Sequence, residues 1–492
     1  MNPASWRRLL AFDSLLWAAP LIIAMILAAS MAFTSAFNAH PDEIEHARAA
    51  DYYRTNWLPP QFGDPAAVSS YSKYGISYLH ERDFVYLLAG KWSNVVAPLV
   101  GGVNLAYRLF NLMLLAMIAF AFVRWPDARP LIAPMALSAQ IWYVFSYFNG
   151  DAFALAVALF AAFQVTVRGS AFNAALDAST RIRWLKGVIA LGIGFGLLLL
   201  TKRNYYVFIA FLLAYVVLKE VGLRASLAIA FGTLLGVGWY YRIPADAPAW
   251  LYAFTALAAG AFVVLDIWPH LSDAAFRRRM GTFAAAGAVG LALFLPRVAF
   301  DKLVVENPAN RLSDAVTTAE VYAKDGYKPS QIAANTAVWA LHIRERNISY
   351  FTLLFAAPHW LWRSFQSAVG VYGYMTIVGP GEYYILTALV YMAFLASLGL
   401  GAMRSGDAIA RQTLVIAGVY AVLAVLVSSL HSWTFDYQPQ GRYLFPAFVM
   451  FGIVIANIRG RQPAAAYAMA ALAFVLAAFS FYDVGLALIR RA

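Results

Sequence analysis

The sequence LLWAAPLIIAMILAASM at residues 15–31 leads through a short link into AHPDEIEHARAAD at residues 39–51. The first stretch belongs to a segment, about 12–37, that is long and apolar enough to span a membrane. The whole chain of 492 residues repeats this character, since 62% of its residues are hydrophobic and 13% are charged. A soluble domain is nearer half apolar and a quarter charged. The composition therefore predicts an all-α, polytopic membrane helix bundle.

The polar stretch after the first span predicts a helix that carries acids and a histidine. Pro41 suits the first helical position, and Asp42 and Glu43 suit the first turn. His46 lies four residues after Asp42 and three after Glu43, so these side chains share one face of a helix. Such a group suits a general base or a metal site, although helix capping alone also explains acids at a helix start.

About thirteen segments are long and apolar enough to be membrane spans. They lie at about residues 12–37, 103–123, 130–147, 152–167, 187–200, 205–218, 225–241, 248–268, 281–295, 383–403, 412–430, 443–458 and 463–489. We expect them to form one domain over residues 1–492. Two long polar stretches, about 38–102 and 297–380, then form outer loops, in which about 84–100 and 347–375 are expected to be interfacial helices.

Loop charge predicts the orientation. Lys and Arg gather in alternate short loops, which places those loops and the N-terminus in the cytoplasm. This distribution also accounts for the net charge of +12 without a nucleic-acid partner. The chain has no Cys, which excludes disulfides, thiolate nucleophiles and Cys-ligated metals. We expect a multi-pass protein of a bacterial inner membrane whose polar groups face the periplasm or the cell exterior.

Several polar motifs fall on the outer side in this topology. Asn149 and Asp151 form a turn before a span, where capping is one interpretation and a second acid or metal ligand is another. Lys202 and Arg203, followed by Tyr205, place two cations on the outer side against the charge bias. Charges at membrane depth are functional candidates, and here a lipid phosphate is the natural partner, although snorkelling to the headgroups is the plainer alternative.

The last outer turn reads HSWTFDYQPQGRYLFP at residues 431–446. Arg442 and Tyr443 open the next span from its outer end, where a helix N-terminus favours an anion. His431 and Gln440 lie in the same turn. Arg363 lies in the second outer loop, and a wetted interfacial helix explains it equally well.

The motifs that are missing narrow the chemistry. The sequence has no Walker loop, HExxH, GxSxG or dinucleotide fingerprint. An outward site meets no nucleotide sugars or ATP, so a donor has to arrive already activated, as polyprenyl-phosphate sugars are. A carboxylate base beside a phosphate clamp is suited to moving such a sugar to a hydroxyl.

The Pro-Asp-Glu motif with its following His, together with QPQGRYLFP at 438–446 and SFQSAVGVYGYM at 364–375, resembles a bacterial branch of the GT-C superfamily of integral-membrane glycosyltransferases. The resemblance covers most of the chain in layout but only about 35 residues in motif. It implies an inverting transfer from a polyprenyl-phosphate sugar to a glycan, lipid or cell-envelope acceptor.

Carried onto this sequence, the resemblance makes Asp42 the base that deprotonates the acceptor. Glu43 would assist it or bind a metal, and Asp151 would be a second acid. Lys202, Arg203 and Arg442 would hold the donor phosphate. The remaining substrate-binding candidates are His46, Asn149, Tyr205, Arg363, His431, Gln440 and Tyr443. A divalent Mg or Mn ion, if one binds, would use Asp42, Glu43, His46 and Asp151.

Two other functions compete with this one. An O-antigen polymerase or ligase also has a long outer loop with clustered Arg, but no acidic motif after the first span. A transporter or flippase of lipid-linked sugars predicts ionisable residues within the spans and broken helices in matched halves. The clustering of polar groups on one side favours the transferase.

Overall fold

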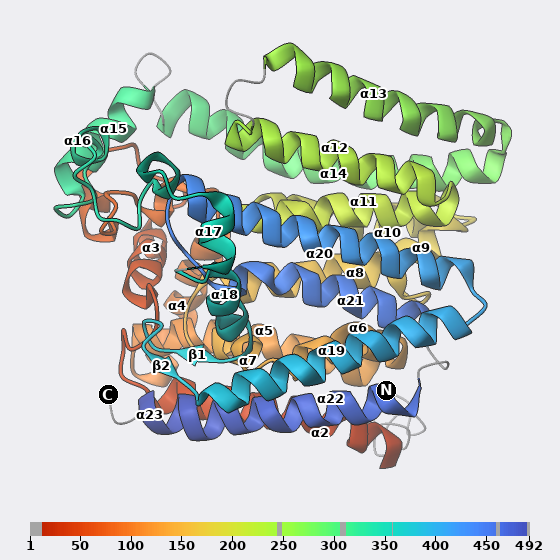
Figure 1. Cartoon of the computed structure of the whole chain (residues 1–492), viewed down its shortest axis with the longest axis horizontal. Coiled ribbons are helices and arrows are strands. Elements are labelled where there is room, and N and C mark those ends of the chain that lie inside the picture. The colour runs from red at the N-terminus through yellow and green to blue at the C-terminus, as the bar shows by residue number, and fades with distance from the viewer. Residues whose placement is uncertain (1–11, 244–247, 306–310, 357, 459–462, 490–492) are drawn as a thin grey trace.

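The computed structural model describes residues 12–243, 248–305, 311–356, 358–458 and 463–489. Long helices run roughly parallel through the molecule, and short helices and a small hairpin gather at one end of them (Figure 1). The long helices are α2 (Phe12–Thr34), α5 (Val103–Arg124), α8 (Gly150–Thr166), α10 (Arg181–Leu199), α11 (Tyr206–Glu220), α12 (Leu223–Tyr241), α13 (Ala249–Ile267), α14 (Ala274–Phe300), α19 (Gly381–Arg404), α20 (Ala408–Thr434), α21 (Phe445–Asn457) and α22 (Ala464–Phe479).

The first predicted outer loop and the turns contribute mostly short helices. They are α3 (Glu43–Thr55), η1 (Pro65–Ser70), η2 (Tyr78–His80), α4 (Val85–Val100), η3 (Pro126–Ala128), α9 (Ala171–Leu176), η5 (Arg203–Tyr205) and η6 (Trp268–Ser272). The second outer loop and the C-terminal part contain η7 (Asp301–Val305), α15 (Arg311–Tyr322), α16 (Pro329–Ala333), η8 (Ile343–Arg346), α17 (Tyr350–Phe355), α18 (Trp360–Val369), η9 (Gly441–Leu444), η10 (Ser480–Leu486) and α23 (Ala487–Ile489). The strands β1 (Val371–Tyr372) and β2 (Ile377–Val378) pair antiparallel, with Val371 opposite Val378.

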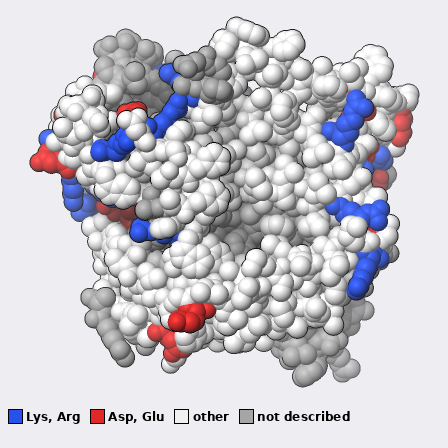
Figure 2. Space-filling model, in the orientation of Figure 1, with Lys and Arg blue, Asp and Glu red and all other residues white. Residues whose placement is uncertain are grey.

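The prediction of an all-α polytopic membrane protein is confirmed. Within the described residues, nine helices are long and apolar enough to cross a membrane. Each of them coincides with a predicted span. The other four predicted spans correspond to α2, to a broken segment, and to the shorter helices α11 and α21. On the face that Figure 2 shows, charged side chains gather towards the two ends of the long helices and leave an uncharged band between them, as expected where charge in a bilayer core is costly.

The third predicted span, 130–147, is not one helix. It divides into α6 (Arg129–Ile132), the 3₁₀ helix η4 (Ala133–Leu137) and α7 (Ala139–Ser146). Prolines stand at the starts of α6 and η4, where the missing N–H is tolerated. Ser138 then caps α7, because its side chain accepts a hydrogen bond from the N–H of Ile141.

The boundary of the second outer loop also differs from the prediction, which began it near residue 297. Helix α14 continues to Phe300 despite Pro296 inside it. Arg297 and Asp301 lie four residues apart, and Arg297 Nε donates to Asp301 Oδ1 at 2.7 Å. This pair supports the extra turn of helix that polarity alone had assigned to a loop.

Small residues allow the long helices to pack closely. A Cβ added at Gly192 of α10 would lie 2.6 Å from the side chain of Val289 on α14. Membrane helices associate through such small-residue contacts because lipid provides no hydrophobic driving force between them. This packing fixes the ends of the helices, and therefore the side chains that meet there.

Candidate functional site

Four charged side chains line up at the end of the bundle that carries the short helices. Arg442 Nη2 lies 3.2 Å from Asp42 Oδ2, and Arg442 Nη1 lies 3.5 Å from Asp151 Oδ2. Lys202 Nζ donates to the same Asp151 Oδ2 at 3.0 Å. Acids and bases alternate along this row, which we call the charge row. Its members come from the first, second, third and last of the outer turns singled out in the sequence.

Asp42 occupies an unusual backbone conformation at the start of α3. Its φ is +57°, in the left-handed region, which Asp adopts more readily than most residues. Its side chain makes no capping hydrogen bond to α3. The carboxylate is 40% exposed, whereas its partner Arg442 is 6% exposed. Capping therefore does not account for this acid, which faces solvent beside a buried cation.

Asp151 is placed by the residue before its helix. Asn149 caps α8, because its side chain accepts hydrogen bonds from the N–H groups of Asp151 and Ala152. The Asp151 side chain is thereby left for the charge row. It is fully buried, and within the described part of the chain its Oδ1 has no hydrogen-bond partner. A buried carboxylate oxygen without a hydrogen bond destabilises the folded protein, so its presence suggests that a bound ligand or water supplies the partner.

Arg442 is held by a close contact between η9 and α18. A Cβ on Gly441 would come within 2.0 Å of the backbone N of Ala368, so only glycine allows this approach. The Gly441 N–H donates to Ser367 Oγ at 3.0 Å. The Arg442 Nε donates to Gln440, and its guanidinium carbon lies 5.7 Å from the ring centre of Tyr443. Two other motif residues therefore hold the arginine.

Glu43 takes no part in the charge row. Arg108 of α5 binds both of its carboxylate oxygens, with Nε to Oε1 at 2.7 Å and Nη2 to Oε2 at 2.9 Å. Both side chains are buried. Arg108 also donates to the carbonyls of Ala32, Ser35 and Ala36 at the end of α2. This ion pair holds the start of α3 against α2 and α5, and so it positions the neighbouring Asp42.

His46 lies near the charge row, in a pocket lined by aromatic side chains. Its Nδ1 lies 2.7 Å from Tyr86 Oη, and its ring stacks on Tyr78 with 4.3 Å between centres. Burial lowers the pKa of His46 well below its ordinary value, and the charges of Lys202 and Arg442 lower it further. Both effects favour the neutral imidazole, and its Nε2 has no hydrogen-bond partner among the described residues.

The remaining predicted site residues are not members of the charge row. Tyr205 is buried one turn from Lys202, and its hydroxyl has no partner in the described part of the chain. Arg203 is largely exposed and pairs with Glu81 at 3.1 Å. Arg363 interacts with Tyr437, and the ring of His431 lies 5.5 Å from that of Phe435.

Two residues beside the site escaped the sequence-based reasoning. Arg108 could have been found from the sequence, since a lone arginine inside an apolar span is energetically unfavourable unless an acidic side chain or carbonyl group binds it. Asp83 had none, because it looked like one polar residue among many in a loop. It lies close to Gly150 and Lys202, and burial raises its pKa to about 7.

The four residues expected to bind a metal do not fit one. Among the described residues no three His, Asp or Glu side chains gather as a metal site. Arg442 stands between Asp42 and Asp151, and Arg108 occupies both oxygens of Glu43. The arrangement offers a solvent-facing carboxylate, Asp42, paired with a buried arginine, and a lysine one step further along the row. A carboxylate can accept a proton, and the two cations can bind an anion.

Comparison with known proteins gives one similar structure. No family model and no curated protein matches the chain. The chain is similar to the crystal structure of ArnT from Cupriavidus metallidurans bound to undecaprenyl phosphate, with 14% sequence identity and a TM-score of 0.44. The match covers 93% of this chain and 62% of that chain, so this protein spans less than two thirds of the ArnT chain. A likeness at this level carries no argument about activity.

Proposed function

We propose that the protein is a GT-C type glycosyltransferase that moves a sugar from a polyprenyl-phosphate donor to a hydroxyl of a glycan, lipid or cell-envelope acceptor. The observation that carries this proposal is the charge row, in which the exposed carboxylate of Asp42 pairs with the buried Arg442, and Asp151 links Arg442 to the largely buried Lys202. We place the reaction at the outer face of a bacterial inner membrane, as the loop charges predict.

In the proposed reaction Asp42 accepts the proton of the acceptor hydroxyl. The hydroxyl oxygen attacks the anomeric carbon of the sugar from the side opposite the phosphate, which inverts that carbon. The bond between the anomeric carbon and the phosphate oxygen breaks, and its electron pair stays on the phosphate. Arg442 and Lys202 stabilise the charge that develops there, because cations largely shielded from solvent act strongly on a developing anion.

The residues around the charge row take supporting parts in this proposal. Asp151 orients Arg442 and Lys202, since its Oδ2 atom contacts both cations. Glu43 acts through its ion pair with Arg108 and sets the position of α3. Among the other candidates, Gln440 and Tyr443 hold Arg442 in place.

The experiment that tests this function measures release of polyprenyl phosphate. Purified protein in detergent receives short polyprenyl-phosphate sugars and an envelope lipid extract, beside the variants Asp42→Asn and Asp325→Asn. Asparagine is the right replacement at 42 because it tolerates the positive φ, whereas alanine would add strain. Asp325 has an 88% exposed side chain far along the second outer loop and serves as the charge control.

We expect release by the wild type and by Asp325→Asn, and a loss of at least 100-fold in Asp42→Asn, the size typical of removing a general base. Equal release by Asp42→Asn and the wild type would exclude Asp42 as the base. Movement of the intact sugar lipid across proteoliposomes, without release, would replace the transferase with a flippase.

A further inference from the structure

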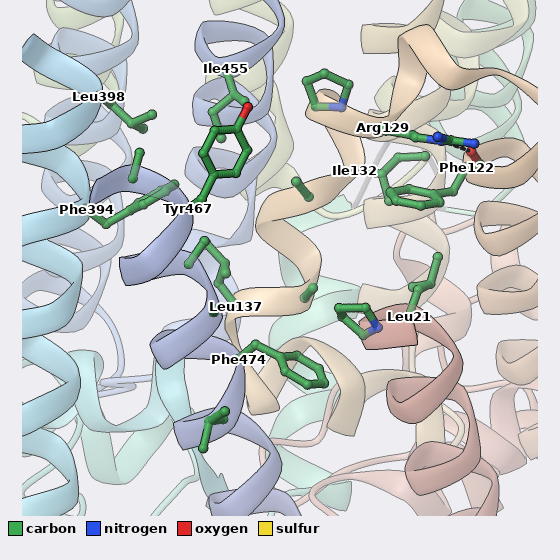
Figure 3. Close-up of a pocket in the computed structure, with 18 of the residues that line it drawn as sticks. Leu21, Phe122, Arg129, Ile132, Leu137, Phe394, Leu398, Ile455, Tyr467 and Phe474 are labelled. Atoms are coloured by element: carbon green, nitrogen blue, oxygen red, sulfur yellow. Dashed lines mark hydrogen bonds between the residues drawn. The ribbon is translucent and has the colours of Figure 1, made fainter. Parts of the chain in front are cut away.

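A large apolar cavity lies in the half of the bundle away from the charge row. Its volume is about 950 Å³, and it is lined mainly by α2, the broken segment α6–η4, α19, α21 and α22. Figure 3 shows Leu137 and Phe474 at one part of its wall and Arg129 beside Phe122 at another. The lining runs along α22 from Ala466 to Val475, which is about 14 Å of helix.

The cavity exists because its walls carry little side-chain volume. Helix α22 presents alanines to it, among them Ala466 and Ala470, which are four residues apart on one face. The facing wall is η4 with Ala133 and Ala136, where the chain is a 3₁₀ helix and not the full span that the sequence predicted. All lining side chains except Arg129 and Tyr467 are nonpolar.

The single charge of the lining stands at one end of the cavity. Arg129 is half-buried, its Nε donates to the carbonyl of Phe122 at 3.3 Å, and its guanidinium lies 5.7 Å from the Phe122 ring centre. A guanidinium has five donors in a planar fork, a geometry that matches the oxygens of a phosphate. Arg129 lies past the end of α5 that is remote from Arg108, and hence at the opposite end of the bundle from the charge row.

We propose that this cavity is a binding site for an anionic glycerophospholipid, whose acyl chains fill the apolar volume and whose phosphate binds Arg129. A hydrocarbon-lined space within membrane-spanning helices excludes water and favours chains. A cation at its end selects an anionic headgroup, because the charge-assisted pair is strong where solvent is scarce. A donor lipid would have to place its phosphate at the charge row, so a headgroup at Arg129 belongs to a resident phospholipid.

The test measures lipid binding to the full-length protein after delipidation in detergent. Native mass spectrometry follows phosphatidylglycerol, phosphatidylcholine and undecaprenyl phosphate, each offered alone and in competition. The variants are Arg129→Gln and Ala470→Phe, which fills the cavity. Two matched controls are Arg411→Gln, at the same end of the bundle, and Ala468→Phe, on the exposed face of α22.

We expect phosphatidylglycerol to bind more tightly than phosphatidylcholine. Arg129→Gln should weaken phosphatidylglycerol binding about tenfold, the effect of losing one charge-assisted hydrogen bond. It should weaken phosphatidylcholine binding less, because the choline cation offsets the charge of that lipid's phosphate. Ala470→Phe should reduce both lipids, and the two controls should reduce neither. If Ala470→Phe does not fold, Arg129→Gln still decides, since it removes a charge without adding volume.

Unchanged phosphatidylglycerol binding in Arg129→Gln would overturn the proposal. Equal affinity for the two phospholipids would also overturn it. Displacement of phosphatidylglycerol by an equal concentration of undecaprenyl phosphate would assign the cavity to the donor lipid instead.

Discussion

The ion pair between Glu43 and Arg108 shows how one buried contact supports a site without belonging to it. The pair joins α3 to the ends of α2 and α5, and both partners are almost completely buried. A buried pair adds little by itself, but the loss of one partner leaves the other charge without compensation. The sequence presented Glu43 as a catalytic candidate, and nothing near it in the chain indicated that a residue 65 positions later would bind it.

We predict that Arg108→Met destabilises the protein strongly. The free energy of unfolding should fall by about 3–5 kcal/mol, because the charged Glu43 stays buried and unpaired. Arg203→Met is the matched control, since Arg203 and Glu81 form an exposed pair worth less than about 1 kcal/mol. Thermal unfolding in one detergent compares the two. Similar losses in both variants would show that burial of the pair has no special weight.

Asp83 predicts a pH dependence of stability. Burial raises its pKa in the folded protein to about 7, above the unfolded value near 3.8. As the pH rises from about 4 to 7, the unfolded chain releases this proton while the folded protein keeps it. The folded state thus binds more protons in that range, and Asp83's contribution to stability is lost as the pH passes 7.

The measurement is the Tm of wild type and Asp83→Asn at pH 5 and pH 8. We expect the wild type to lose more stability between the two values than the variant does, since Asn has no proton to release. Asp325→Asn should keep the wild-type pH profile. A profile unchanged in Asp83→Asn would show that Asp83 is ionised in the folded protein at pH 5.

At the scale of elements, the contact of η9 with α18 decides where Arg442 points. The motif QGRYLFP could be recognised in the sequence, but its glycine gained a meaning only through Ala368, which lies 73 residues earlier. Sequence periodicity identifies a helix and its apolar face, whereas it carries no information on which backbone will approach another within van der Waals contact. The same limit explains why the break of the third span was predictable from Pro130 and Pro134 only in hindsight.

We predict that Gly441→Ala separates η9 from α18. The added Cβ would overlap the backbone of Ala368, at a cost of about 1–3 kcal/mol, the range for overpacking. Gly418→Ala in the middle of α20 is the control, because its Cβ would meet nothing within 4 Å and alanine favours a helix. The Tm should fall in the first variant and hold or rise in the second. Equal Tm values would mean that η9 and α18 can move apart freely.

At the scale of the whole molecule, the pattern of apolar and charged segments along the chain predicts the fold. Composition and span length were sufficient to predict the all-α membrane bundle, because a bilayer leaves few ways to satisfy the backbone. The meeting of Asp42, Asp151, Lys202 and Arg442 needed one further step, the assignment of their turns to one side. Arg108 and Asp83 could not be predicted in this way, because they reach the site from within a helix and a loop and not from one of those turns.

Topology can be tested directly because the chain has no cysteine. We predict that Asp325→Cys, in the second outer loop, reacts with a membrane-impermeant maleimide in intact cells. Arg411→Cys, at the opposite end of the bundle, should react only after the membrane is permeabilised. The opposite pattern would invert the orientation that the loop charges predict and would place the charge row in the cytoplasm.

The link between Asp42 and Arg442 has a kinetic consequence for the proposed reaction. In the structure the base is engaged by the very cation that the donor phosphate would need. An arriving phosphate competes for Arg442 and thereby releases Oδ2 of Asp42 from its ion pair, so the carboxylate becomes fully available to the acceptor once a donor is bound. Turnover should then follow a compulsory order in which the donor lipid enters first, and a dead-end complex with acceptor alone should not accumulate.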